Sequence, residues 1–154
     1  MTLSPSLQIR TATLADLDLL TPLFDAYRMF YRYPSDLNTA RTFLQARLQQ
    51  QQALILLAEQ DGAALGFTLI YPSFCSLAAA PLWILNDLLV LPQARRHGVA
   101  RALLQAAQAQ ARAAGVARIT LQTAHDNLQA QALYTQLGFV RDAVFYNYDF
   151  TLPA

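Results

Sequence analysis

The sequence predicts a single α/β domain with a mixed, mostly antiparallel sheet of six or seven strands and helices on both faces. Three observations lead to this prediction. A length of 154 residues suits one domain of ordinary size. Hydrophobic residues make up 55% of the chain and charged residues 14%, so a large core can form and disorder is excluded. The apolar period changes repeatedly between that of a helix and that of a strand, without an internal repeat or linker, so we expect one domain over residues 1–154.

The first third of the chain predicts a short strand followed by two helices. After a strand over residues 8–11, Thr13 and Asp16 have the spacing of a helix start. Apolar and aromatic residues then recur every three or four positions. Pro22 interrupts this stripe, so we expect a kink there or a second helix that begins with Thr21 as its cap. Another helix is expected over residues 36–51.

A hairpin and a central strand are expected next. Residues 54–58 and 65–71 flank Asp61-Gly62, a dipeptide typical of a tight hairpin turn. Residues 82–90 form a nearly continuous apolar run, which is typical of a strand in the middle of a sheet. Asn86 and Asp87 break this run, and two buried polar side chains in an apolar strand need a physical reason.

The last third predicts two helices and two strands. An alanine-rich helix is expected over residues 98–114, because its small apolar side chains fall on one side and its arginines and glutamines on the other. A strand over residues 119–123, a helix over 127–137 and a last strand over 144–152 are expected to follow.

Composition excludes several classes of function. All eleven basic residues are arginine and the formal charge is +1, which provides no basic surface for nucleic acid. The longest apolar run, residues 77–85, is too short to span a bilayer, so no membrane partner is expected. Cys75 has no partner for a disulfide and we expect no secretory signal, which predicts a cytoplasmic protein. Cys75, His97 and His125 lack the spacing of metal ligands, so no metal is expected.

The stretch over residues 90–104 is the most informative about chemistry. It reads V-L-P-Q-A-R-R-H-G-V-A-R-A-L-L, an apolar strand that passes through a loop into a helix beginning at Gly98. The unpaired amides of a helix start bind anions, and Arg95 and Arg96 add positive charge, so the stretch predicts a pyrophosphate site. In the alternative interpretation, Gly98 only permits the turn and the arginines are solvated. The phosphate loop G-x-x-x-x-G-K-[ST] is excluded because the chain has no lysine, and G-x-G-x-x-G is absent.

The chain resembles the GNAT N-acetyltransferase superfamily in its two cofactor motifs. The motifs are W-I-L-N-D-L-L-V at 83–90 with R-x-x-G-x-A at 95–100, and N-L-Q-A-Q-A-L-Y-T-Q-L-G-F at 127–139. The layout of the whole chain is similar, and the specific motifs cover residues 83–139. The segment F-D-A-Y-R-M-F-Y at 24–31 resembles the bacterial branch of histone and polyamine acetyltransferases.

This resemblance implies how acetyl-CoA is bound. In the superfamily a bulged central strand splays from its neighbour, and pantetheine pairs with its backbone, here that of Leu88, Leu89 and Val90. The residues around the pyrophosphate would be Arg95, Arg96, His97, Gly98, Val99, Ala100 and Arg101. Asn127 would bind the pantetheine arm, or cap the last helix, and the two functions are compatible.

The resemblance also implies direct transfer in a ternary complex, in which Tyr134 protonates the departing thiolate. Tyr134 as a core residue is the alternative. Relatives often carry a glutamate where this chain has Asn86, and an amide is not a base. We therefore expect Asn86 to orient a water that removes the amine proton. Asp87 would have a structural part or would support Asn86 from behind, because alternation places the two on opposite faces unless a bulge intervenes. Tyr27 and Tyr31 would border the acceptor pocket.

The function expected is N-acetyl transfer from acetyl-CoA to a primary amine. The acceptor is a small molecule such as a polyamine or amino compound, or a lysine or N-terminal amine of a peptide. A non-catalytic acyl-CoA-binding or interaction protein is the alternative that Asn86 leaves open and that Tyr134 argues against. A purely structural oligomerisation module would leave the loop at residues 95–100 unexplained. We expect a homodimer, with Tyr146 and Tyr148 available for the subunit surface.

Overall fold

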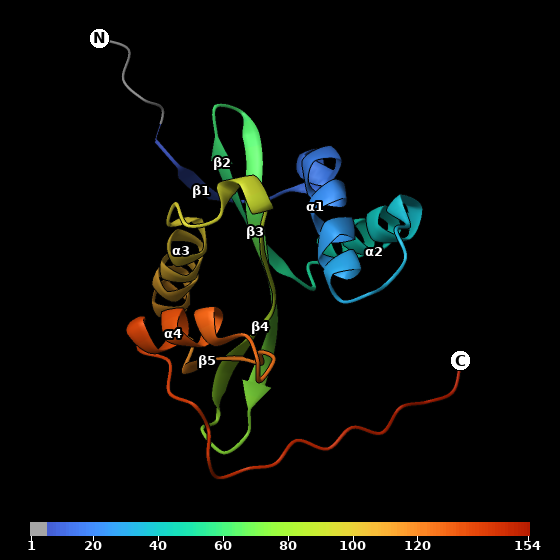
Figure 1. Ribbon diagram of the computed structural model, residues 1–154. Coiled ribbons are helices and arrows are strands. Elements are labelled where there is room, and N and C mark those ends of the chain that lie inside the picture. The colour runs from blue at the N-terminus through green and yellow to red at the C-terminus, as the bar shows by residue number, and fades with distance from the viewer. Residues whose placement is uncertain (1–5) are drawn as a thin grey trace. The chain divides into compact units, whose positions relative to one another are not determined.

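The computed structural model describes residues 6–154. The chain forms two compact units, Met1–Gln122 and Thr123–Ala154. The prediction of one domain remains a prediction. The first unit contains a sheet with helices on both of its faces (Figure 1). Its elements are β1 (Gln8–Thr11), α1 (Leu17–Phe30), α2 (Leu37–Gln49), β2 (Leu54–Gln60), β3 (Ala63–Cys75), β4 (Ala80–Val90), α3 (Val99–Ala113) and β5 (Arg118–Leu121). The second unit contains α4 (Leu128–Gln136).

The sheet is mixed and mostly antiparallel, as predicted. Its strands lie in the order β1-β2-β3-β4-β5, and only the pair β4–β5 is parallel. The prediction of six or seven strands is wrong, because the described residues form five. The strand predicted over residues 144–152 is missing. Its aromatic residues alternate as in a strand, but side chains such as Phe145 and Tyr148 are exposed and bury no face, and the segment pairs with no strand.

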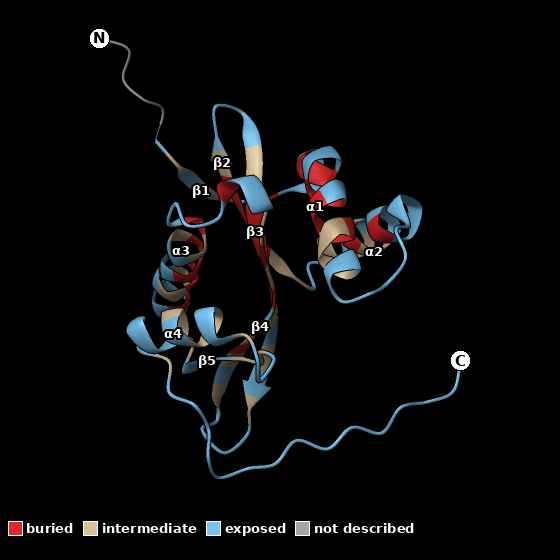
Figure 2. Ribbon diagram, viewed as in Figure 1, coloured by how far each residue is buried: buried red, intermediate tan, exposed pale blue. Residues whose placement is uncertain are grey.

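Two hydrophobic layers fix the positions of the helices on the sheet. Alternate residues of β2 and β3 face the helices α1 and α2. This core includes Leu20, Phe24, Leu44, Ile55, Leu57, Phe67 and Leu69. The intervening residues Leu56, Thr68 and Ile70 are also buried, and alternation turns them to the opposite face, against which α3 packs. Figure 2 shows buried residues along these strands and on the side of α3 that faces them. The alanines of α3 let that helix approach the sheet closely, as its composition predicted.

Helix α1 begins after a short 3-10 turn, η1 (Leu14–Asp16). The backbone amide of Thr13 donates to the Asp16 carboxylate at 2.7 Å, which confirms the predicted helix start. The helix then continues through Pro22 as one element, so a second helix starting at Thr21 does not form. The Thr21 hydroxyl donates instead to the carbonyl of Leu17, one turn earlier. Among the described residues, no helix is long and apolar enough to cross a membrane.

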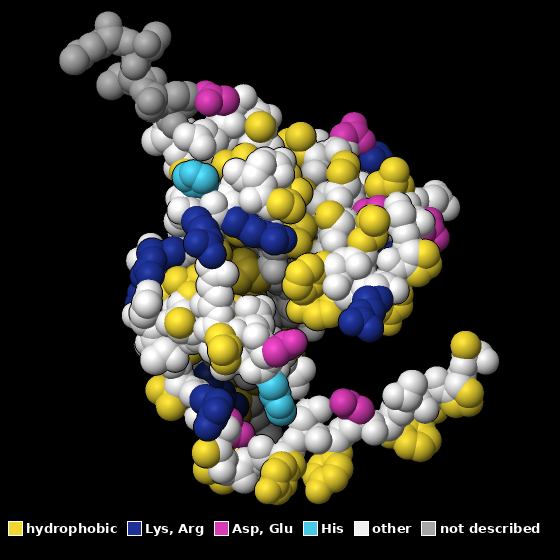
Figure 3. All heavy atoms as spheres, viewed as in Figure 1, with side chains coloured by type: hydrophobic (Ala, Val, Ile, Leu, Met, Phe, Trp, Pro, Cys, Tyr) yellow, Lys and Arg dark blue, Asp and Glu magenta, His cyan; other side chains and the backbone are white. Residues whose placement is uncertain are grey.

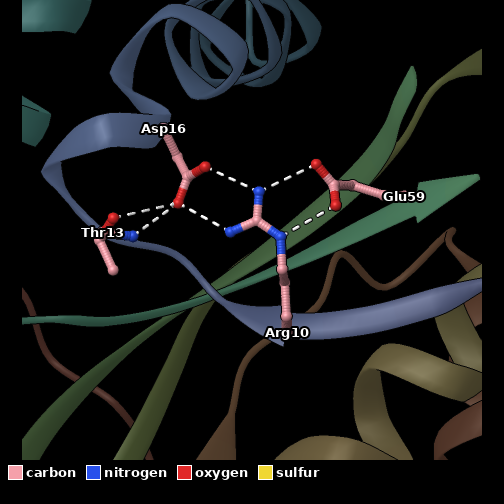
Figure 4. A network of polar contacts seen from close by, with 4 residues as sticks. All are labelled: Arg10, Thr13, Asp16 and Glu59. Carbon is pink, nitrogen blue, oxygen red and sulfur yellow. Dashed lines mark hydrogen bonds and ion pairs between the residues drawn. The ribbon is translucent and has the colours of Figure 1, made fainter. Parts of the chain in front are cut away.

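Two ion pairs of Arg10 connect β1 to η1 and to β2 (Figure 4). The guanidinium of Arg10 donates to both oxygens of Asp16 at 2.7 and 2.9 Å, and to both oxygens of Glu59 on β2 at 2.9 Å. These hydrogen bonds from Arg10 hold the pKa of Asp16 and that of Glu59 below their usual values. A group with a lowered folded-state pKa stabilises the fold at neutral pH, and this contribution disappears as the pH falls through that pKa.

Replacing Arg10 by glutamine should therefore reduce both stability and its acid dependence. The side chain of Arg10 is 40% exposed, so solvent screens the pairs and we expect a loss of about 1 kcal/mol at pH 7. Urea unfolding at several pH values measures both effects. The control is Arg41→Gln, because the Arg41–Asp18 pair is exposed. An Arg10→Gln protein that loses stability in acid as steeply as the wild type would contradict this account.

Candidate functional site

A β-bulge in β4 interrupts its pairing with β3. Leu69 of β3 pairs with Asp87, but the next residue, Ile70, pairs with Leu85, so Asn86 is an extra residue in β4. The bulge shifts the phase of the strand, and Leu85 lies with Ile70 on the face of α3. Asp87 shares the opposite face with Leu69, in the core beneath α1 and α2. Such a phase shift was expected only if a bulge lay in this strand, and the register places the bulge at Asn86.

Asp87 is a buried carboxylate, with 3% of its surface exposed. The side-chain amide of Asn86 donates to its Oδ1 at 2.8 Å. Burial raises the pKa of Asp87 above the usual value, and the hydrogen bond from Asn86 opposes that shift. The carboxylate is therefore fixed in position and takes up a proton more readily than an exposed aspartate does.

Two tyrosines at the C-terminal end of α1 lie beside the bulge. The Tyr27 hydroxyl, on α1, donates to the backbone carbonyl of Asn86 at 3.2 Å, and the ring of Tyr31 lies edge-on to that of Tyr27, with 5.1 Å between centroids. Burial and the charge of Asp87 raise the pKa of Tyr27 well above its usual range, and raise that of Tyr71 on β3 as well. Both hydroxyls stay protonated at neutral pH. The structure thus brings the predicted residues Tyr27, Tyr31 and Asn86 together.

The edge of β4 beyond the bulge has no neighbouring strand. Pairing with β5 ends at Leu85, which lies opposite Leu121, and in the described chain no other strand continues along that edge. The predicted pantetheine partners Leu88, Leu89 and Val90 follow directly. This open edge lies where an extended, amide-bearing chain could pair with the backbone of β4.

The loop after β4 leads to the start of α3. Gly98 caps the helix with a φ of +79°, which favours glycine. The first helical hydrogen bond joins the amide of Ala102 to the carbonyl of Gly98, so the amides of Val99 and Ala100 have no acceptor within the helix. The Arg95 side chain donates to the carbonyl of Val90 at 3.1 Å, and basic side chains gather around this helix start (Figure 3). The open edge and these amides fit the pantetheine and pyrophosphate of coenzyme A.

Comparison with known proteins decides the family. The model of the acetyltransferase (GNAT) family matches residues 20–139. The chain belongs to the GNAT family. It is similar to the uncharacterized N-acetyltransferase YhfO of Bacillus subtilis (strain 168), with 44% identity over 148 residues that cover 96% of this chain and 99% of YhfO.

Solved structures agree with this assignment. The crystal structure of a probable acetyltransferase has a TM-score of 0.90 and 43% sequence identity, and the match covers 96% of this chain and 99% of that one. A ribosomal-protein-alanine N-acetyltransferase from Brucella melitensis biovar Abortus 2308 is 21% identical, with a TM-score of 0.76 over 94% of this chain and all of the other. It shows similarity of fold alone.

The remaining predicted site residues of this GNAT protein lie in its second unit. The side chain of Asn127 accepts from the amide of Ala130 at 3.3 Å, so its function as the cap of α4 is confirmed. Tyr134 lies seven residues further along and is half-buried, and its ring is edge-on to that of Phe139 at 5.9 Å. The cofactor contacts of Asn127 and Tyr134 remain predictions.

Tyr71 was not among the site residues that the sequence predicted, and Asp87 was not predicted to take part in proton transfer. Tyr71 belongs to the site because it lies two residues from Leu69 on the same face of β3. Asp87 was expected to have a structural or supporting part; it is buried opposite Leu69 on the face beneath α1, and its function in the reaction stays a prediction. Both assignments depend on the β3–β4 register, and the only signal in the sequence was the unexplained pair of polar residues in an apolar strand.

The approach of β3 to β4 in this GNAT protein requires a glycine. Gly66 lies opposite Val90, and a Cβ atom there would be 2.5 Å from the carbonyl oxygen of Leu89. Gly66→Ala should therefore separate the strands and lower the free energy of unfolding by about 1–3 kcal/mol. Urea unfolding measures this, with Ala63→Ser at the exposed start of the same strand as control. An unchanged midpoint for Gly66→Ala would show that the strands can adapt.

Proposed function

We propose that this GNAT protein transfers the acetyl group of acetyl-CoA to a primary amine of a small molecule or peptide, by direct attack in a ternary complex. One observation carries the proposal. The bulge at Asn86 places a buried carboxylate, Asp87, at the point where β4 becomes an open edge that leads to the start of α3. Acetyl-CoA supplies the thioester, and the chain's own residues bind and orient both substrates and move protons.

The cofactor-binding residues that we propose are those that the sequence predicted. Backbone groups of Leu88, Leu89 and Val90 would pair with the pantetheine arm along the open edge. The amides at the start of α3 would hold the pyrophosphate, with charge from the nearby arginines. The residues of this cradle are Arg95, Arg96, His97, Gly98, Val99, Ala100 and Arg101.

Asp87 is our candidate for the group that receives the amine proton. The amine must lose a proton because it is mostly protonated at neutral pH. Asn86 was expected to orient a water for this step. Its side chain donates to Asp87, which supports a path through such a water to the carboxylate, with Asn86 as a positioning residue. Tyr27, held on the carbonyl of Asn86, would border the amine together with Tyr31.

The reaction balances with these groups. The amine nitrogen forms a bond to the thioester carbon, the C–S bond breaks, and the amine proton goes to Asp87 directly or through water. Tyr134 remains our candidate for the acid that gives a proton to the thiolate, so that coenzyme A leaves as the thiol. Asp87 then releases its proton to solvent and Tyr134 regains one from solvent, which restores both groups. The alternative of a non-catalytic binder rested on the amide at position 86, and the carboxylate beside it argues against that alternative.

A homodimer in the cytoplasm remains part of the proposal. The last segment exposes a run of large apolar side chains, Val144, Phe145, Tyr146, Tyr148 and Phe150, and contiguous exposed apolar surface marks interaction sites. Sedimentation of the whole protein would give twice the monomer mass if this is correct.

Binding of acetyl-CoA tests the cofactor site. At 100 times its dissociation constant, a ligand stabilises the fold by about 2.7 kcal/mol, which thermal unfolding detects readily. Arg95→Gln should weaken this stabilisation, whereas Arg112→Gln, at the other end of α3, should leave it unchanged. The absence of any stabilisation would reject the cofactor site. Stabilisation without turnover of any amine in a broad panel would favour the non-catalytic binder.

A further inference from the structure

We infer that the acceptor amine also carries a carboxylate, as amino acids do, and that Arg47 of α2 binds this carboxylate beside Tyr71. The inference rests on the proposed function and deepens it, because it names the class of acceptor. It makes Arg47 a specificity-determining residue.

Arg47 has the environment of an unused anion ligand. Its guanidinium lies 4.7 Å from the centroid of the Phe43 ring, and its Nε is buried without a hydrogen-bond partner. In the described part of the chain, ion pairs form at Arg10 and Arg41 and none involves Arg47. Buried donors are normally satisfied, so this one indicates a partner that arrives with a ligand. A guanidinium shielded by an aromatic ring offers a planar set of donors that matches a carboxylate.

Tyr71 connects Arg47 to Asp87. Tyr71 packs against the same core as Phe43 and shares a face of β3 with Leu69, the partner of Asp87. The backbone amide of Gln52 donates to the carbonyl of Arg47 at 2.9 Å, and β2 begins two residues later with Leu54 opposite Ile70, the neighbour of Tyr71. In keeping with this placement, the charge of Asp87 raises the pKa of Tyr71 and the charge of Arg47 opposes that rise. The two charges nevertheless form no ion pair with each other. Two unpaired opposite charges around one aromatic residue suit a ligand with an ammonium and a carboxylate.

A second arginine with a buried, unpartnered nitrogen does not fit this function. Arg28 lies 5.3 Å from the ring centroid of Tyr33, and its charge lowers the pKa of Asp36, so it serves the segment between α1 and α2. The charge of Arg47 also discriminates against some acceptors. A polyamine would bring a second cation toward this guanidinium, and like charges disfavour binding.

Matched pairs of acceptors test the inference. Each pair consists of an amino acid and the amine left after decarboxylation, for example phenylalanine with 2-phenylethylamine and lysine with cadaverine. The wild type should prefer the amino acid in kcat/KM. Arg47→Gln should raise KM for the amino acid by about 10- to 100-fold, the range for a charge-assisted hydrogen bond, with little change in kcat. The kcat/KM for the decarboxylated amine should be nearly unchanged. Arg47→Lys should restore part of the preference, and Arg41→Gln on the same helix should have no effect.

A merely structural Arg47 would give a different result. The inference would be overturned if Arg47→Gln lowered kcat/KM equally for both members of a pair. A wild type with the higher kcat/KM for the decarboxylated member would overturn it as well. If the simple amines alone are acetylated, the proposed function stands and the inference fails.

Thermal unfolding in the presence of coenzyme A, with the same amino acids and amines as probes, separates the remaining cases. Stabilisation by an amino acid in the wild type but not in Arg47→Gln supports the inference even if no amine is acetylated, in which case the proposed function fails. No stabilisation by any amino acid of a panel overturns the inference.

Discussion

Asp87→Asn should lower kcat/KM for amine acetylation by about 100-fold or more, because general base catalysis contributes at least that much. The substitution keeps the shape of the side chain and an oxygen to accept from Asn86, but it removes the group that takes the proton. Asp18→Asn is the matched control, because Asp18 is an exposed aspartate on α1. Initial rates of thiol release measure the effect, and a variant with wild-type kcat/KM would remove Asp87 from the reaction.

The pH dependence gives the same prediction a second readout. Because activity requires ionised Asp87, kcat/KM of the wild type should rise with pH through the pKa of Asp87, which burial places above the usual aspartate value. This acidic limb should vanish in Asp87→Asn. The free energy of unfolding should depend on pH in the opposite direction. A group with a raised folded-state pKa stabilises the fold while it is protonated, and this contribution is lost as the pH rises through that pKa. At neutral pH the asparagine variant should therefore be at least as stable as the wild type.

Tyr134→Phe should lower kcat by about 100-fold, a typical contribution of a general acid, with little change in the affinity for acetyl-CoA. The phenyl ring keeps the contact with Phe139 and removes only the hydroxyl that would protonate the thiolate. Tyr148→Phe, at an exposed tyrosine of the last segment, is the control. Pre-steady-state rates and acetyl-CoA titrations separate the two effects. A wild-type rate in Tyr134→Phe would assign Tyr134 to the core instead.

Local signals in the sequence predicted most helices and strands. The Asp61-Gly62 turn joins β2 and β3 as expected, and the helix expected over residues 98–114 is found at Val99–Ala113. The helix expected over 36–51 is found at Leu37–Gln49. Turn chemistry, capping residues and apolar period decide these elements within a few neighbouring residues. For that reason they are readable without knowledge of the tertiary structure.

Features that depend on partners distant in sequence were harder to predict. The strand expected over residues 144–152 has the right alternation, but a strand also needs a neighbour for its backbone groups. The position of the bulge at Asn86 follows from the pairing of β3 with β4, and this pairing alone turns Asp87 toward α1. The function of Tyr71 and the unpartnered Nε of Arg47 likewise depend on contacts between separate elements. The sequence indicated the polar pair in the central strand but not the direction of its side chains.

Transfer of a labelled acetyl group tests the central claim most directly. Acetyl-CoA labelled in the acetyl group is mixed with the enzyme and a panel of amines, and mass spectrometry and thiol release are followed together. Direct transfer predicts one labelled N-acetyl amine for each thiol released, at a rate that requires both substrates, with no label on the protein during turnover. Thiol release without an acetylated amine, or a labelled acetyl group on Cys75 that then passes to the amine, would contradict the account.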